Sequence, residues 1–414
     1  MTATGHTTGE HADLNGAFAA TMAGVPGLSA STAGGSPLAL AVSGGPDSMA
    51  LAVLMRDWAA EQTATPRLSG LIVDHGLRPE SATEAETVAT RLRALGIAPH
   101  ILRWEGKKPG SAVQATARDA RYRLMLQWCR DRGADALFLG HHSDDQAATV
   151  RMRLERGSGL DGLAGMRPVT ARDGVMICRP LLQMPKTALV ALLQARQIAW
   201  VEDPSNTDER FERNRIDQVL RDAGPVAVAR LLRLGRRAAR AVDALNRWAA
   251  TCWDDLATVD AECRVTLAAG FADLPEELRL RLLIRAATSA GGQEPALAAA
   301  EGALALLDAG QGATLGRAVV RFRGGRLVLT REHRNLPDMA WPNGGTALDW
   351  DGRFLLRATR PVHDRLRVAP DARTLPSLQG ADIETTGAGN WQLPDGNRIE
   401  RHCLACSPGS RIRL

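Results

Sequence analysis

Short apolar runs alternate with longer amphipathic stretches over the first half of the chain. Between residues 37 and 193 the runs lie at 38–42, 68–73, 100–104, 136–139 and 175–178. Each run is short enough for a buried strand, and apolar residues between the runs have helical spacing. Such alternation is typical of β-α units around a parallel sheet. It predicts an α/β domain with a doubly wound parallel sheet over residues 36–222.

The pattern changes after Asp222-Ala223-Gly224-Pro225. Ala, Leu and Arg then recur at helical spacing to about residue 307, which predicts a helical domain over 223–311. Beyond Gly312, short alternating runs broken by Gly and Pro predict a small β-rich C-terminal domain over 312–414. Residues 1–35, rich in Ala, Gly, Thr and Ser, are expected to form a flexible N-terminal extension.

The composition is that of an ordinary soluble globular protein, with 45% apolar and 23% charged residues. No apolar run approaches the roughly 18 residues of a membrane span. The N-terminus also lacks the basic start and apolar core of a secretory signal. The six cysteines are too few and scattered for a disulfide scaffold, and the single pair Cys403/Cys406 is half of a four-ligand zinc site. We therefore expect a cytoplasmic protein with no membrane partner.

The clearest local motif follows the first apolar run. Ser43-Gly44-Gly45-Pro46-Asp47-Ser48 leads directly into an apolar helical stretch. The glycines allow a tight turn, and the free N–H groups and dipole of a helix N-terminus favour an anion. Pro46 is tolerated because the first helical position needs no N–H. The motif therefore predicts a phosphate site.

This phosphate motif is not a Walker A loop, because no lysine lies within 50 residues of it. It matches the S-G-G-x-D-S loop of the PP-loop ATP pyrophosphatases, which bind the β and γ phosphates of ATP and release pyrophosphate. The resemblance implies that Ser43, Gly44, Gly45, Pro46, Asp47 and Ser48 bind ATP. It also implies that Asp47 is catalytic and holds Mg²⁺, for which a carboxylate oxygen is a suitable ligand.

Further motifs occur in a fixed order over about 180 residues. They are Val73-Asp74-His75-Gly76-Leu77-Arg78, Ala117-Arg118-Asp119-Ala120-Arg121-Tyr122, Gly140-His141-His142-Ser143-Asp144-Asp145-Gln146, Arg156-Gly157-Ser158-Gly159, Arg179-Pro180-Leu181-Leu182, Glu202-Asp203-Pro204-Ser205-Asn206 and Arg213-Asn214-Arg215. Taken together with the PP loop, this ordered set resembles the tRNA(Ile)-lysidine synthetase family. Two of the motifs follow predicted strands, where an open α/β sheet binds its ligands.

The resemblance implies a reaction with ATP, Mg²⁺, free L-lysine and tRNA(Ile) with a CAU anticodon. In that family C2 of the wobble cytidine is adenylated, and the lysine ε-amine then displaces AMP. Arg118 is the candidate catalytic cation near the adenylate. The catalytic carboxylates Asp144 and Asp145 are placed near the lysine ammonium or a second metal. A homodimer is left open.

Two other functions remain open at this stage. The first is a PP-loop enzyme that installs sulfur at a tRNA cytidine, although that chemistry uses a C-x-x-C pair in the catalytic domain. Here the predicted catalytic domain has only isolated Cys129 and Cys178. The second is a non-catalytic nucleotide-binding regulatory module, which would explain the loop but neither Asp47 nor the motifs that follow it.

Arginine is the main basic residue, because the 51 Lys and Arg residues include only three lysines, Lys107, Lys108 and Lys186. The net charge of +5 is compatible with a polyanionic partner. Two groups of arginines are candidates for contact with a tRNA backbone. One lies in the motif Arg213-Asn214-Arg215, and the other follows one side of a predicted helix. These candidates are Arg213, Arg215, Arg230, Arg233, Arg237 and Arg240. The four helical arginines, Arg230, Arg233, Arg237 and Arg240, form a stripe that is explained equally well as a solvated helix face.

One position departs from the family pattern. The family continues the Asp-Asp-Gln stretch with Ala-Glu-Thr, whereas this chain has Ala147-Ala148-Thr149. In a helix that starts near Ser143, a Glu at position 148 would share a face with Asp144 and Asp145. We therefore expect a high KM for lysine, and we expect Ala148→Glu to lower it.

Overall fold

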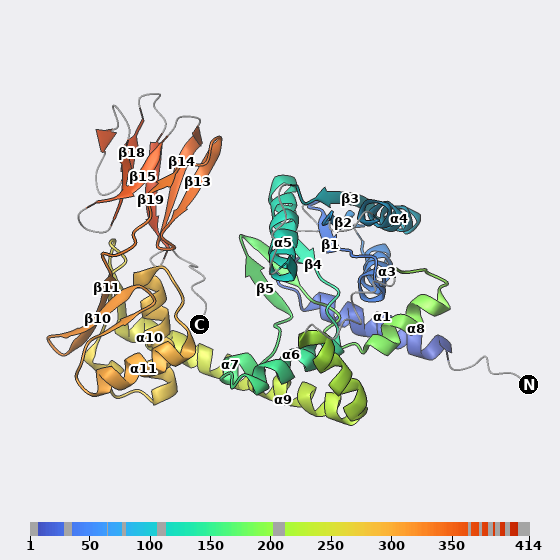
Figure 1. Ribbon diagram of the computed structural model, residues 1–414, viewed down its shortest axis with the longest axis horizontal. Coiled ribbons are helices and arrows are strands. Elements are labelled where there is room, and N and C mark those ends of the chain that lie inside the picture. The colour runs from blue at the N-terminus through green and yellow to red at the C-terminus, as the bar shows by residue number, and fades with distance from the viewer. Residues whose placement is uncertain are drawn as a thin grey trace, which may run out of the picture. The chain divides into compact units, whose positions relative to one another are not determined.

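The computed structural model forms two compact units, Met1–Arg240 and Ala241–Leu414, which are described here one at a time (Figure 1). The structure describes residues 7–28, 35–63, 65–76, 80–105, 113–201, 212–362, 366–371, 375–379, 384–385, 390–393 and 398–404. Among these residues, no helix has the length and apolar character needed to cross a membrane.

A six-stranded sheet organises the first unit, with strand order β3-β2-β1-β4-β6-β5. Its strands are β1 (Leu38–Ala41), β2 (Leu68–Asp74), β3 (Ala98–Arg103), β4 (Ala136–Phe138), β5 (Val169–Arg172) and β6 (Val175–Cys178). All neighbours are parallel except β5, which runs antiparallel to β6. The predicted parallel α/β sheet is confirmed, and the order reverses at β1, where β2 lies on one side and β4 on the other.

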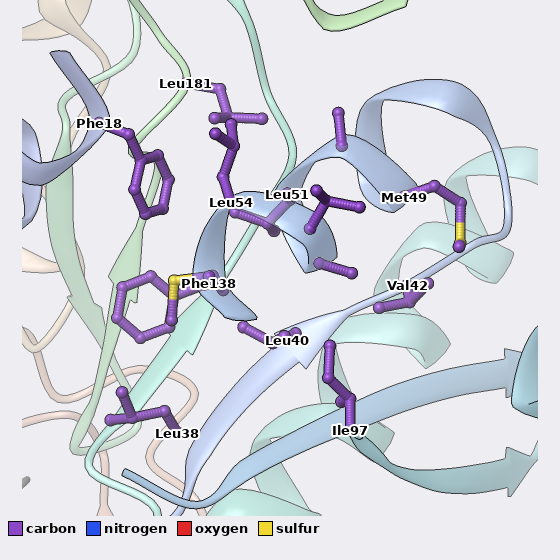
Figure 2. Packing of buried hydrophobic residues seen from close by; sticks show 14 of the residues in the cluster. Phe18, Leu38, Leu40, Val42, Met49, Leu51, Leu54, Ile97, Phe138 and Leu181 are labelled. Atoms are coloured by element: carbon purple, nitrogen blue, oxygen red, sulfur yellow. The ribbon is translucent and has the colours of Figure 1, made fainter. Parts of the chain in front are cut away.

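Helices cover both faces of this sheet. The helices α3 (Pro46–Ala60), α4 (Ser81–Ala94) and α8 (Lys186–Ala195) contribute to one apolar cluster with β1, and α5 (Val113–Arg132) contributes to another. In the first cluster Leu38 and Leu40 of β1 lie near Leu51 and Leu54 of α3 (Figure 2). The core beside β1 thereby fixes the start of α3, which carries the predicted phosphate loop.

The N-terminal segment is not wholly a flexible extension. Helix α1 (Thr7–Ala23) packs against α3, and its Phe18 is only 1% exposed in the cluster shown in Figure 2. Val25 and Leu28 are also buried there. Burial of a side chain of this size contributes about 1.5–3 kcal/mol, which is enough to attach the helix to the domain.

Two helices complete the first unit beside the carboxyl ends of the strands. They are α6 (Ser143–Glu155) and the short α7 (Leu160–Leu163). Ala147 and Ala148 of α6 pack against Ile216 and Leu220 of the long helix α9 (Glu212–Leu256). Helix α9 has a kink at Gly224, where φ is 77° and ψ is 176°. The predicted boundary at residue 223 lies beside this kink, whereas the first compact unit extends along α9 to Arg240.

The second unit begins with a mixed helical and β region. Its antiparallel sheet has the order β7-β8-β11-β10-β9, and α10 (Glu276–Gly291) and α11 (Leu297–Asp308) share its core. The strands are β7 (Ala257–Val259), β8 (Val265–Leu267), β9 (Ala313–Leu315), β10 (Ala318–Arg323) and β11 (Arg326–Arg331), and a 3-10 turn covers Ala269–Phe271. The segment 223–311, predicted as a helical domain, contains α10 and α11 but also β7 and β8, which join the same sheet as β10 and β11.

Two further sheets follow. One has the order β12-β15-β16 and the other β13-β14-β19-β18-β17. The strands are β12 (Met339–Ala340), β13 (Gly345–Trp350), β14 (Phe354–Val362), β15 (Arg367–Pro370), β16 (Pro376–Gln379), β17 (Glu384–Thr385), β18 (Asn390–Gln392) and β19 (Arg398–Cys403). Cys263 lies in their core and forms a disulfide with Cys403, while Cys406 lies outside the described residues. Cys403 thus pairs across 140 residues of sequence.

Candidate active site

The loop between β1 and α3 is held in shape by its own residues. Ser48 Oγ accepts hydrogen bonds from the backbone N–H groups of Ser43 and Gly44, each at 3.2 Å, and donates to the Gly45 carbonyl at 3.0 Å. Gly44 has φ +89°, and a Cβ there would lie 2.4 Å from Val88 Cγ2. The left-handed backbone and this close approach both require glycine. The hydrogen bonds of Ser48 and the glycine backbone therefore define the shape of the loop.

The carboxyl end of β4 lies directly against this loop. A Cβ on Gly140 would lie 3.0 Å from the backbone carbonyl oxygen of Asp47 and 3.2 Å from the backbone nitrogen of Ser48. Glycine therefore allows the two chain segments to touch. As a consequence, the residues that follow Gly140 and begin α6 lie beside the phosphate loop.

His142 is the centre of the resulting charge cluster. Its Nε2 lies 3.6 Å from Asp47 Oδ2 and 3.5 Å from Asp145 Oδ2, and its Nδ1 lies 3.4 Å from Asp144 Oδ2. Burial disfavours a charged imidazole, but the hydrogen bonds to Asp144 and Asp47 and the charge of Asp145 outweigh it and raise the pKa of His142 to about 9. The three carboxylates predicted from separate motifs are thus brought together around one cation.

Both carboxylates in the first turn of α6 are held in the ionised form. The hydrogen bond from His142 is the largest cause that lowers the pKa of Asp144 to about 2, and the backbone N–H of Lys186 donates to Asp144 Oδ2 at 2.9 Å. Burial opposes ionisation of Asp145, but His142 and Arg213 outweigh it and lower the pKa of Asp145. Arg213 donates to Asp145 Oδ1, and the backbone N–H of His142 donates to Oδ2 at 3.0 Å.

Lys186 contributes a second cation to the loop. It is the first residue of α8, and its Nζ lies 3.9 Å from Asp47 Oδ2. The other carboxylate oxygen, Asp47 Oδ1, is buried and has no hydrogen-bond partner among the described residues. One oxygen of Asp47 therefore lies near two cations, while the second is buried and has no hydrogen-bond partner among the described residues.

Arginines gather around the only tyrosine of the chain, Tyr122. The guanidinium carbons of Arg118 and Arg172 lie 5.6 and 5.2 Å from its ring centroid. Arg179 follows β6 and donates to the carbonyl of Arg167 at 2.9 Å, and burial lowers the pKa of Arg179. Arg118 is exposed and forms no ion pair among the residues that the structure describes. It is thus a cation that can accept an anionic ligand.

Besides His142, three residues near the site were not predicted as site residues by the sequence analysis. His141 is neutral, because burial lowers its pKa to about 4, with smaller effects of Arg179 and Arg118 in the same direction. Asp217 lies one helical turn beyond Arg213 on α9, and burial raises its pKa. His141 lies in the motif 140–146, whereas Asp217 has no local signal in the sequence. The third residue, Lys186, could have been noticed as one of only three lysines.

The motif after β2 forms a turn that is stabilised by side-chain hydrogen bonds. Asp74 Oδ1 accepts hydrogen bonds from the backbone N–H of Gly76 at 2.9 Å and from Ser81 Oγ at 2.8 Å. His75 contacts Arg121, with Nε2 3.0 Å from Nη2, and its ring lies edge-on to Trp104. Leu77 and Arg78, like the stretch 202–206, lie outside the described residues.

The arginine candidates separate into two groups. Arg230, Arg233, Arg237 and Arg240 are exposed on α9, and a hollow of about 490 Å³ is lined by Arg233, Arg236, Arg237, Ala239 and Arg240. Arg213 instead lies in the carboxylate cluster, and Arg215 is exposed beside it in sequence. The stripe on α9 is therefore a concentrated positive surface, whereas Arg213 neutralises Asp145.

Ala148 does not lie on an open face with the two carboxylates. It is 0% exposed and packs with Ile216 and Leu220 of α9. The helical spacing placed it near Asp145 along the helix, but α9 covers that position. The structure thus removes the geometric basis for the expected gain of lysine affinity from Ala148→Glu.

Comparisons with known proteins identify a matching domain family and several similar relatives. A PP-loop domain family matches residues 25–223. The tRNA(Ile)-lysidine synthase of Bradyrhizobium diazoefficiens is 42% identical over 282 residues, which covers 66% of this chain and 78% of that protein. The synthases of Ruegeria pomeroyi and Rhizobium meliloti are 37% and 36% identical, over 69% and 76% of this chain and 68% and 70% of the respective relatives.

One of the matching solved structures is a more distant protein. The U34-tRNA thiolase NcsA from Methanococcus maripaludis matches with a TM-score of 0.43 at 18% identity, over 50% of this chain and 72% of that chain. A likeness at this level carries no argument about function.

Proposed function

Because this chain belongs to the tRNA(Ile)-lysidine synthase family of PP-loop enzymes, we propose that it ligates L-lysine to C2 of the wobble cytidine in tRNA(Ile) with a CAU anticodon. The family assignment rests on 36–42% identity over more than two thirds of each of these relatives. ATP drives the ligation, and AMP and pyrophosphate are the products. The activity is that of a ligase that forms a C–N bond.

The first step joins the cytidine to AMP. The O2 atom of the base attacks the α phosphorus, the bond from that phosphorus to the oxygen that bridges to the β phosphorus breaks, and pyrophosphate leaves with the electron pair. The hydrogen-bonded loop around Gly44 and the N-terminus of α3 suit the phosphates, because helix N-termini stabilise anions. Arg118 supplies a positive charge near the adenylate.

Asp47 is suited to hold Mg²⁺ during this step. Its buried Oδ1 makes no hydrogen bond among the described residues, so this hard oxygen ligand needs a cation. Mg²⁺ commonly binds through one or two protein carboxylates together with substrate phosphates. When bound, it would neutralise charge on the phosphates.

The second step requires a site for free lysine. We assign the lysine ammonium to Asp144 and Asp145, because their lowered pKa values keep both charged at neutral pH. Their present partners, His142 and Arg213, keep these carboxylates in place. Asp217 is a third acid close to Asp145. Attack of the neutral ε-amine on C2 then displaces AMP, and activation as an adenylate makes this substitution possible.

The tRNA backbone is assigned to the arginine stripe on α9. Arg230, Arg233, Arg237 and Arg240 are exposed on the same helix, and Arg215 is the further candidate near the active site. Arginine forms bidentate contacts with phosphate, and a hollow lined by several guanidinium groups concentrates positive charge.

The structure disfavours transfer of sulfur. Cys129 and Cys178 are buried, and burial raises the pKa of each thiol to about 12. A thiolate is the reactive form of cysteine, so burial disfavours both residues as the nucleophile at neutral pH. A purely regulatory ATP-binding module would not need the cluster of Asp47, Asp144 and Asp145 around His142.

Release of pyrophosphate without lysine tests the proposed first step. The protein is mixed with ATP, Mg²⁺ and either tRNA(Ile) with a CAU anticodon or the same tRNA with the wobble cytidine replaced by guanosine. We expect one turnover of pyrophosphate release with the CAU form and none with the control. Equal release with both tRNAs, or release with neither, would refute adenylation of the wobble cytidine.

A further inference from the structure

Lys186 occupies a position that is electrostatically unfavourable for a cation in an isolated helix. It is the first residue of α8, and the positive end of a helix dipole repels a positive side chain. It is also the only lysine in the described part of a chain whose basic residues are otherwise arginine. A nearby group of opposite charge is therefore expected to offset this repulsion.

The contacts of Lys186 identify that partner as the phosphate loop. Its backbone N–H donates to Asp144 Oδ2 at 2.9 Å, which fixes the first turn of α8 beside α6. Its ammonium reaches Asp47 Oδ2 at 3.9 Å, a distance longer than a hydrogen bond. The side chain is 51% exposed, so the ammonium can move toward a ligand.

We propose that Lys186 is a catalytic residue that binds the terminal phosphates of ATP and stabilises the pyrophosphate leaving group. The proposal rests on the proposed function, since it concerns the same adenylation step. As the bond between the α phosphorus and the bridging oxygen breaks, negative charge collects on the pyrophosphate. The ammonium of Lys186 donates hydrogen bonds to this charge and keeps its protons, so the step needs no further reactant.

This role explains why a cation stands at position 186. The loop before α3 contains no basic residue, although phosphate transfer requires positive charge near the leaving group. Lysine is a compact point charge on a flexible chain, so its ammonium can reach the phosphates from the start of α8. Lys186 thus supplies from α8 the charge that the loop lacks.

The alternative is that Lys186 only neutralises Asp47. In that case its removal would change the stability of the loop and would leave the affinity for pyrophosphate intact. Two measurements on Lys186→Met, Lys186→Arg and Arg93→Met separate these roles. Arg93→Met removes the same charge from an exposed position in the last turn of α4. That end lies away from the carboxyl ends of the strands, because α4 runs back from β2 to the start of β3.

The first measurement is single-turnover pyrophosphate release with saturating ATP and CAU tRNA, without lysine. Loss of one charge-stabilising donor lowers such a rate by about 100-fold, which is the effect expected for Lys186→Met. Lys186→Arg keeps the charge and should recover most of the rate, and Arg93→Met should match the natural protein. A rate for Lys186→Met within twofold of the natural protein would overturn the proposal.

The second measurement is calorimetric binding of magnesium pyrophosphate to the same proteins. We expect weaker binding by Lys186→Met alone, with the melting temperature unchanged. Unchanged pyrophosphate affinity would assign Lys186 to the structural role and overturn the proposal. This assay needs no tRNA. If the natural protein failed to release pyrophosphate with CAU tRNA, the proposed function would fail while the binding assay would still test Lys186.

Discussion

The substitution Ala148→Glu places a carboxyl group inside the contact between α6 and α9. Ala148 is fully buried against Ile216 and Leu220, with Met152 and Val228 packed around the cluster. Added side-chain atoms in a packed core cost about 1–3 kcal/mol. Burial among apolar side chains raises a carboxyl pKa by several units, each worth about 1.4 kcal/mol at neutral pH. We therefore expect a loss of about 4 kcal/mol or more in the free energy of unfolding.

The loss should be visible as a lower melting temperature of the first unit. For a domain of this size each kcal/mol shifts the melting temperature by about 2–4 °C, so a decrease of roughly 10 °C is expected. Ala148→Gln is the matched control, because it adds nearly the same volume without a charge. The pKa of the introduced carboxyl group is raised in the folded state. Compared with Ala148→Gln, the additional loss in the free energy of unfolding is therefore absent below about pH 4 and grows as the pH rises.

Lysine kinetics complete this test. Because position 148 faces Ile216 and Leu220, Ala148→Glu should not lower the KM for lysine at a temperature where the variant is folded. A variant with an unchanged melting temperature and a lower KM would show that position 148 opens toward the lysine site. That result would refute the packing argument and restore the expectation drawn from the helical spacing.

Three other substitutions test separate parts of the site. Asp47→Asn should slow pyrophosphate release by about 10³-fold with the melting temperature unchanged, and near-normal release would remove Asp47 from the metal site. Asp144→Asn should cost about 1 kcal/mol in urea unfolding above pH 4, because its side chain is 45% exposed and solvent screens the pair. Since the folded pKa of about 2 lies below the ordinary 3.8, this deficit should disappear as the pH falls toward 2, and a constant deficit would contradict it. Replacing both Arg233 and Arg237 with Gln should lower the salt dependence of tRNA binding by about two units of slope, whereas an unchanged slope would leave the stripe as a solvated face.

The sheet of the first unit could be predicted because its parallel strands are buried on both faces. The residues of β1 and β4 form continuous apolar runs, and the glycine loop after β1 marks where the helix begins. Strand β5 gave no such signal, since it is a half-exposed edge strand whose Val-Thr-Ala-Arg alternation covers only four residues. The three-residue strands β7 and β8 are too short for a period to be recognised. Helix α1 was not predicted, because the Ala, Gly and Thr content of this segment indicated a flexible extension although Phe18 is buried.

The sequence predicted several residues of the candidate site but not the contacts that these residues make. Separate motifs placed Asp47, Asp144 and Asp145 at the carboxyl ends of neighbouring strands, where parallel topology brings them together. Their partners could not be predicted locally, because Arg213 lies 68 residues from Asp145 and Lys186 follows a different strand. Burial of Ala148 likewise depends on the path of α9 and not on the sequence around α6.

The most direct test of the central claim is the ratio of lysine joined to RNA and AMP released. The protein is incubated with ATP, Mg²⁺, labelled L-lysine and tRNA(Ile) with a CAU anticodon, and the wobble nucleoside is identified by mass spectrometry after digestion. We predict one lysine on the wobble cytidine for each AMP released. Release of AMP without incorporation of lysine, or lysine found at any other nucleoside, would contradict the assignment.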